Sequence, residues 1–178
     1  MRERPALPPI PDSPLRLVRR ERPDAEAYRA LFRRVGEPWL WFSRLVLDEA
    51  TLLAIVHDPQ VQVFAVIDAA GEDAGMLELD FRHSGACELS YFGLAPGFEG
   101  KGNGRWLMAE ALTRAWAAGI TRVWVHTCSL DHPSALGFYR RHGFTPIGRA
   151  VETFADPRLH GVLPREAAPQ VPLLIPRN

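Results

Sequence analysis

The stretch GLAPGFEGKGNGRWLMAEAL, residues 93–112, joins a strand-like run to a helical pattern through a glycine-rich loop. From Gly104 onward, apolar residues recur every three or four positions, which predicts a helix that ends at Gly119. A helix that begins directly after small residues presents unpaired amides and the positive end of its dipole. Because both features attract anions, the stretch predicts a phosphate site at the start of the helix.

Two common phosphate-binding motifs do not fit this loop. A P-loop requires glycine at position 95 and Ser or Thr after its lysine, but the chain has Ala95 and Gly102 there. A dinucleotide-binding fingerprint that begins at Gly102 requires a small residue where the chain has Leu107. The glycines taken alone are also compatible with a simple flexible turn.

The sequence on both sides of the loop predicts helices around an antiparallel sheet. Upstream, Asp24 is expected to cap a helix that runs to Arg34, and aromatic-rich helical turns follow up to Pro59. Three strand-like runs come next, separated by short glycine-containing turns that favour antiparallel pairing: VQVFAVID (61–68), AGMLELDFR (74–82) and ACELSYFGL (86–94).

Downstream of the loop helix, the pattern alternates between strand and helix. TRVWVHT (121–127) predicts a strand, the turns after Pro133 predict a helix that ends at Gly143, and FTPIGRAVETF (144–154) predicts a final strand. The fold class is therefore α+β, with a mixed, mostly antiparallel sheet flanked by helices.

Proline placement divides the chain of 178 residues into one domain and two tails. Prolines lack the amide that strands and helices need, and they cluster at both ends of the sequence. We expect a Pro-rich N-terminal tail over residues 1–14, one domain over 15–156, and a Pro-rich C-terminal tail over 157–178. A hydrophobic content of 47% suits a single core.

The charge balance and the cysteine content exclude several classes of protein. The formal net charge is zero, so the sequence has no overall field to hold a nucleic acid or an anionic membrane, and neither partner is expected. The two cysteines, Cys87 and Cys128, do not form a disulfide framework. No secretory leader or membrane-length apolar run is evident, and a cytoplasmic location is the expectation.

Two motifs together resemble the GNAT acyltransferase family over about residues 61–154. The first joins a strand with an apolar-x-Pro turn to a Q/R-x-x-G-x-G/A loop and a helix, and it is matched here by Leu94, Pro96, Gly102 and Gly104. The second is A-x-x-F-Y-x-x-x-G-F, and it is matched by ALGFYRRHGF (135–144). The chain departs from the family pattern at Glu99, where the family has Gln or Arg, and at His132, where Asn is common.

The resemblance implies a GNAT-like fold that moves an acetyl group from acetyl-CoA to a primary amine on a small molecule or peptide. It implies that main-chain amides hold the diphosphate, while Glu99 points to solvent or pairs with Lys101. The Leu94 amide would polarise the thioester carbonyl. The implied cofactor-binding residues are Leu94, Gly100, Lys101, Gly102, Asn103, Gly104, Arg105 and His132.

The resemblance also makes Tyr139 a general acid for the leaving thiolate, although a core aromatic is the alternative. A base is useful too, because deprotonating an amine with a pKa of about 10.4 at pH 7 costs roughly 4.6 kcal/mol. Strand alternation places Glu88, Ser90 and Phe92 on one face of a strand, and Glu78 and Asp80 on one face of the preceding strand. Glu88 is the first choice because its strand leads into the glycine loop. Each of these acids is also compatible with a solvated position on the sheet.

Several other residues allow more than one interpretation. The residues His126, Cys128 and His132 lack a fourth ligand and a second knuckle, so no metal is expected. Trp39 and Trp41 are compatible with an acceptor pocket, with the core, or with an interface such as that of a homodimer. Two other functions stay open: a non-catalytic acyl-CoA sensor, and an interaction module whose Pro-rich tails bind a partner.

Overall fold

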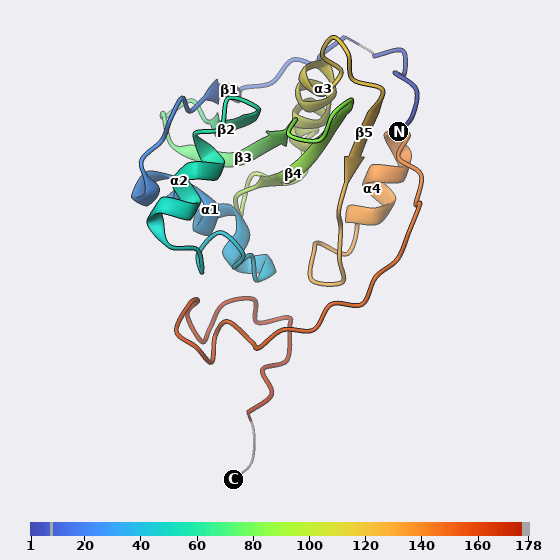
Figure 1. Cartoon of the computed structure of the whole chain (residues 1–178). Helices are drawn as coiled ribbons and strands as arrows, with labels where there is room; N and C mark the ends of the chain where they lie inside the picture. The colour runs from blue at the N-terminus through green and yellow to red at the C-terminus, as the bar shows by residue number, and fades with distance from the viewer. Residues whose placement is uncertain (8, 176–178) are drawn as a thin grey trace.

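A five-stranded sheet forms the centre of the computed structural model, which describes residues 1–7 and 9–175 (Figure 1). Its strands are β1 (Arg16–Arg19), β2 (Val61–Ile67), β3 (Asp73–Asp80), β4 (Ala86–Leu94) and β5 (Arg122–Val125). They lie side by side in this order, and each pair is antiparallel except β4 and β5, which are parallel. The predicted α+β class with a mixed, mostly antiparallel sheet is confirmed.

The helices connect the strands in the predicted order. α1 (Ala25–Gly36), the short 3-10 helix η1 (Glu37–Trp39) and α2 (Glu49–Val56) lie between β1 and β2; α3 (Asn103–Ala115) joins β4 to β5, and α4 (Ala135–Arg141) follows β5. The Asp24 carboxylate caps α1 by accepting from the Ala27 amide at 2.7 Å. Within the described residues, the helices are too short or too polar to cross a membrane.

A separate hydrophobic core covers each face of the sheet. On one face, α1 and α2 pack against β2 and β3, and Tyr28, Phe32 and Met76 are buried there. On the other face, α3 packs against β3 and β4, and Leu107 lies in a core that also contains Tyr139 of α4. The strand β4 and the helix α3, which flank the glycine loop, are therefore held by close packing.

An extra residue in β4 reverses the direction in which its side chains point. The register with β3 pairs Leu79 with Leu89 but Glu78 with Tyr91, so that Ser90 forms a β-bulge with no partner on β3. β-Bulges occur often beside functional sites, because they redirect a side chain locally. This one lies a few residues before the glycine loop.

Simple alternation predicts Glu88, Ser90 and Phe92 on one face of β4, and for Phe92 this prediction is wrong. Glu88 pairs with Asp80 and faces the α1 side of the sheet. Phe92 instead contacts Phe138 of α4, at 5.9 Å between ring centroids, and packs against the core on the α3 side. The bulge causes the difference, since one additional residue moves every later side chain to the opposite face.

The strands β4 and β5 separate halfway along β4. Their pairing runs only from Ala86 opposite Arg122 to Leu89 opposite Val125. From Ser90 to Leu94, β4 continues without a strand on that side, and Figure 1 shows the two strands diverging from this point. The main-chain groups along this edge of β4 have no strand partner and are available to a ligand.

The predicted strand over residues 144–154 does not form. These residues contain neither helix nor strand, and Ile147 and Val151 are exposed. Pro146 has no amide to donate to a ladder, and Gly148 weakens a strand interior. In addition, Met1 already forms two main-chain hydrogen bonds with Val123 at the free edge of β5, at 2.7 and 3.0 Å.

A buried polar network fastens residues 40–47 to the sheet. The Glu78 carboxylate is fully buried, and it accepts a hydrogen bond from the Tyr28 hydroxyl and another from Arg44, each at 2.6 Å. The Arg44 guanidinium also lies 5.3 Å from the centre of the Tyr91 ring on β4. Burial and the Glu78 charge raise the pKa of Tyr28 well above its ordinary value, so the phenol stays a donor. Glu78 is therefore neither solvated nor free to act as a base.

Candidate functional site

The glycine loop, residues 95–102, depends on left-handed backbone conformations. Gly100 and Gly102 have φ angles of 77° and 85°, and Lys101 between them has a φ of 50°. Residues other than glycine rarely adopt these conformations without strain, which explains why the glycines alternate here. A Cβ added at Gly100 would meet no neighbouring atom, so the requirement there comes from backbone conformation and not from crowding.

The first turn of α3 leaves main-chain amides free. Gly102 caps the helix without a side-chain acceptor, while the Asn103 and Trp106 amides bind the carbonyls of Gly100 and Gly102, each at 3.0 Å. The amides of Gly104 and Arg105 meet no acceptor among the described residues. The helix has 13 residues, so its positive dipole end adds to these donors. This is the local arrangement that binds phosphate groups in proteins.

Glu99 is explained by a hydrogen bond inside the loop. Its carboxylate accepts from the Gly97 amide at 2.8 Å, and within the described chain it forms no ion pair with Lys101. The Asn103 side chain adds a second internal bond by donating to the Phe98 carbonyl at 3.0 Å. Glu99 thus lies exposed to solvent, which is one of the two expected alternatives, and its hydrogen bond to Gly97 helps to shape the turn before the free amides.

The last residue of β4 presents its amide to the side where β5 has separated. The Ala95 amide donates to Ala74 of β3 at 2.8 Å, and successive amides along an extended chain point in opposite directions. The Leu94 amide therefore points away from β3. Because β4 has no strand on that side beyond Leu89, this amide is a donor that can reach a bound carbonyl oxygen.

Tyr139 lies in a cluster of aromatic rings between α4 and β4. Its ring is 6.2 Å from Phe92 and 5.7 Å from Phe144, and the residue is 8% exposed. No hydrogen bond to its hydroxyl occurs among the described residues. Burial, and to a smaller extent the charge of Asp131, raises the pKa of Tyr139 above its ordinary value. A phenol is already protonated at neutral pH, as a general acid must be, and the raised pKa makes Tyr139 a weaker proton donor than an exposed tyrosine.

The start of α3 and the helix that carries Tyr139 are close neighbours. A Cβ added at Gly104 would lie 3.5 Å from the Phe138 ring, which is ordinary van der Waals contact. The free amides of α3 and the Tyr139 side chain thus belong to one region, on the α3 side of the sheet. The contact itself is made by Phe138, which precedes Tyr139 on α4.

Glu88 differs from the neighbouring acids because it has no ion-pair partner in the described structure. Asp80 is held by Arg82, with 2.5 Å between Oδ2 and Nη2, whereas Glu88 is half-buried opposite Asp80 and Trp124. Against the effect of burial, the hydrogen bonds from Arg82 keep the pKa of Asp80 below its ordinary range. Burial, and then the Asp80 charge, raise the pKa of Glu88. A half-buried carboxylate with a raised pKa is suited to accepting a proton.

Glu88 and Tyr139 lie on opposite sides of the sheet. Glu88 faces the α1 side with Asp80 and Tyr91, and Tyr139 packs on the α3 side against Phe92. A proton acceptor and a proton donor on opposite sides of β4 suit a reaction in which two substrates meet at the strand from different faces. The sequence analysis predicted both residues as parts of the site, but it did not predict that they lie on opposite faces of the sheet.

His132 belongs to the loop between β5 and α4, where its side chain forms a hydrogen bond within the turn before α4. Its Nδ1 accepts from the Ser134 amide at 3.1 Å, which leaves Nε2 as the nitrogen available to a ligand. The edge of the imidazole also meets Trp39 of η1, at 5.3 Å between ring centroids. Trp41, in contrast, packs in the core against Phe32, at 5.5 Å between centroids. Only Trp39 of these two tryptophans faces the loop after β5.

Comparison with known proteins agrees with this architecture. The acetyltransferase (GNAT) family model matches residues 24–144. An aminoglycoside acetyltransferase, meta-AAC0020, from an uncultured soil metagenomic sample, solved in complex with sisomicin, superposes with a TM-score of 0.61 at 16% identity, covering 80% of this chain and 95% of that one. None of the curated protein sequences matches the chain.

Two further solved structures share the fold. AAC(6')-Iy, in complex with the bisubstrate analog CoA-S-monomethyl-acetylneamine, has a TM-score of 0.60 at 18% identity, covering 80% of this chain and 99% of that one. The GNAT family protein SP0256 from Streptococcus pneumoniae has a TM-score of 0.56 at 18% identity, and the match covers 78% of this chain and 98% of that one. Because the family model spans well over half of the sequence, this chain belongs to the acetyltransferase (GNAT) family.

Proposed function

We propose that the protein transfers an acetyl group from acetyl-CoA to a primary amine. The observation that carries this proposal is the start of α3, which has no side-chain cap and leaves the amides of Gly104 and Arg105 free, directly after the loop that follows the unpaired end of β4. The amides and the helix dipole suit a diphosphate, and the edge of β4 suits the amide groups of the pantetheine arm. The residues that would hold acetyl-CoA are Leu94, Gly100, Lys101, Gly102, Asn103, Gly104, Arg105 and His132.

In this proposal the Leu94 amide stabilises the oxyanion that develops on the thioester carbonyl. The direction of this amide, away from β3 and toward the side without a strand, supports the role. A main-chain donor held by a sheet needs no reorganisation during the reaction, and removing one oxyanion-hole donor typically costs about 2.7–4 kcal/mol of barrier lowering.

Glu88 would remove the proton from the amine, directly or through one water molecule, and Tyr139 would return a proton to the leaving thiolate. The unpaired, half-buried state of Glu88 supports the first role. The protonated phenol of Tyr139, near the start of α3, supports the second. The acceptor would therefore approach from the α1 side of β4, and acetyl-CoA from the α3 side.

Thiol release from acetyl-CoA across a panel of amines tests the proposed function. The panel includes a short linear diamine, a lysine-containing peptide and an aminoglycoside, each with its N-acetylated form as the matched control. We expect at least one free amine to release thiol at a steady rate, while its acetylated form releases none. Saturable binding of acetyl-CoA without turnover of any amine would instead indicate an acyl-CoA sensor, and absence of binding would contradict both functions.

The pH dependence of turnover tests Glu88. If Glu88 must be deprotonated, the slope of log(kcat/KM) against pH falls by one unit at its pKa, which burial and Asp80 raise above the ordinary value of 4.5. Glu88→Gln should lose this break, with a rate lower by about 10²- to 10⁴-fold on the alkaline side. Asp80→Asn should keep the break but move it to lower pH. A Glu88→Gln variant with an unchanged profile would show that another group is the base.

Deleting one hydroxyl tests Tyr139. Tyr139→Phe keeps the ring contacts with Phe92 and Phe144, so the melting temperature and the affinity for coenzyme A should change little. Loss of the general acid should lower kcat by a factor that approaches the range of about 10² to 10⁴ that general acid catalysis typically contributes. The decrease should be smaller with a thioester whose leaving thiol has a lower pKa, since that thiolate needs less help to depart. Full activity in a folded variant would return Tyr139 to a purely structural role.

A further inference from the structure

One buried guanidinium organises the C-terminal segment, residues 156–171. The side chain of Arg158 is only 2% exposed; its Nη2 donates to Asp156 at 2.7 Å, and its Nη1 donates to the carbonyls of Ala167 and Val171, each at 3.0 Å. These bonds join the two ends of a segment that contains neither helix nor strand. A buried arginine with its donors satisfied holds such a segment in one conformation.

The same segment packs against the body of the protein through its own small core. Leu163, Ala167 and Ala168 are buried together with Leu40, which follows η1. Leu130, from the loop between β5 and α4, borders the same cluster. The segment therefore touches both the region after α1 and the loop after β5.

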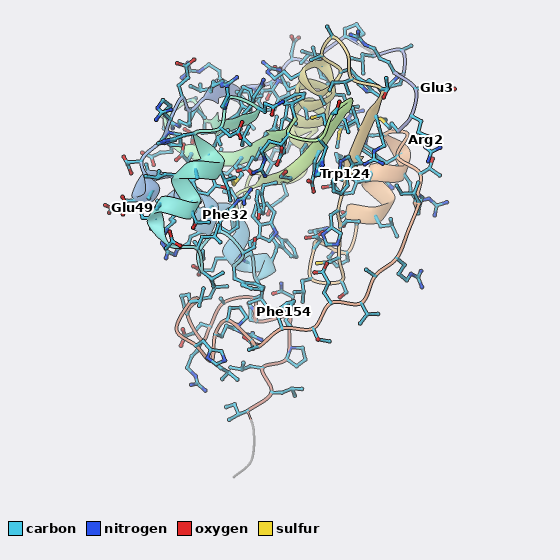
Figure 2. All side chains as sticks on the ribbon, in the orientation of Figure 1. Arg2, Glu3, Phe32, Glu49, Trp124 and Phe154 are labelled. Carbon is cyan, nitrogen blue, oxygen red and sulfur yellow. The ribbon has the colours of Figure 1, made fainter. Side chains whose placement is uncertain are left out.

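Two further contacts attach the C-terminal chain to the region after α1. The Gln170 side chain donates to the Pro38 carbonyl, and the ring of Phe154 lies 4.7 Å from that of Phe42. Figure 2 shows Phe154 on the chain that passes below the helices at this end of the molecule. These residues belong to the predicted tail or lie just before it, yet their contacts are with the folded domain.

The position of this segment places it at one end of the candidate site. Figure 1 shows it below the sheet and the helices, at the end where β4 and β5 diverge, and its contacts with Pro38, Leu40 and Leu130 place it beside η1 and the loop after β5. Trp39 and His132 already meet there, at 5.3 Å between ring centroids. The family match ends at residue 144, before this segment begins.

We propose that residues 156–171 form a strap that bounds the acceptor side of the site and restricts transfer to small amines. The inference rests on the proposed function, in which acetyl-CoA approaches from the α3 side and the acceptor from the α1 side. An acceptor that reaches Ser90–Leu94 from the α1 side must pass the residues that the strap joins. Fastening these residues to one another keeps the entrance narrow, and none of the hydrogen bonds of the strap given above involves the glycine loop.

Loosening the strap without touching the proposed site tests this inference. Arg158→Met keeps the aliphatic stem and the main-chain amide that donates to Asp156, but it removes every side-chain donor to Asp156 and to the carbonyls of Ala167, Ala168 and Val171. Arg165→Gln is the matched control, because Arg165 is an exposed arginine of the same segment with no hydrogen bond or ion pair among the described residues. For each protein, kcat/KM is measured by thiol release with a short linear diamine and with a three-ring aminoglycoside.

We expect Arg158→Met to raise the ratio of kcat/KM for the aminoglycoside over that for the diamine by tenfold or more. The KM for acetyl-CoA should not change, and Arg165→Gln should match the wild type. Amide hydrogen exchange should become faster at residues 38–47 and 128–132 in Arg158→Met, but not at residues 100–106. Leu163→Ala removes an apolar contact between the strap and Leu40, and it should shift the ratio in the same direction. This variant replaces Arg158→Met in the test if Arg158→Met does not fold.

Three results would overturn the inference. An unchanged ratio in folded variants that still turn over the diamine would contradict the strap alone and leave the proposed function standing. The same shift in Arg165→Gln would show that the effect is not specific to the buried arginine. A wild-type protein that binds acetyl-CoA but turns over no amine would remove the proposed function, and the strap would fall with it.

Discussion

The candidate site depends on the unpaired amides at the start of α3, and these depend on glycine. Gly102 caps the helix with a φ of 85° and no side-chain acceptor, so the amides of Gly104 and Arg105 stay free among the described residues. A serine or aspartate at the cap would stabilise the helix by a few tenths of a kcal/mol relative to glycine, but it would occupy one of these donors. The chain forgoes that stabilisation here, whereas α1 and α2 are each capped by an aspartate.

Two irregularities in the sheet place reactive groups around those amides. The bulge at Ser90 turns Phe92 toward the α3 side while Glu88 stays on the α1 side, so that one strand supports a proton acceptor on one face and the Tyr139 cluster on the other. The separation of β5 beyond Leu89 then frees the edge of β4, where the Leu94 amide points. A regular, fully paired sheet would bury this edge and would offer no position for a thioester between the two faces.

Local patterns predicted the strands β2 to β5, the Asp24 cap and the glycine loop, because alternation, capping and left-handed glycine are properties of neighbouring residues. The features that the sequence did not reveal come from contacts between distant residues. Ser90 carries no signal for a bulge, and Glu99 acts through its own loop. In the sequence, Arg158 is one charged residue in a Pro-rich tail, and only the structure shows its carbonyl partners. The strand expected over residues 144–154 does not form, because Pro146 lacks an amide and because Met1 occupies the edge of β5 at Val123.

The claim that free main-chain amides at α3 bind a diphosphate is tested most directly by an NMR titration of the ¹⁵N-labelled protein. Coenzyme A is added to one sample, and pantetheine, which lacks the diphosphate, is added to another. We predict saturable shifts that are largest at the amides of residues 100–105 with coenzyme A, and shifts along residues 90–94 but not 100–105 with pantetheine. Saturable binding of coenzyme A that leaves the amides of residues 100–105 unchanged would contradict the account.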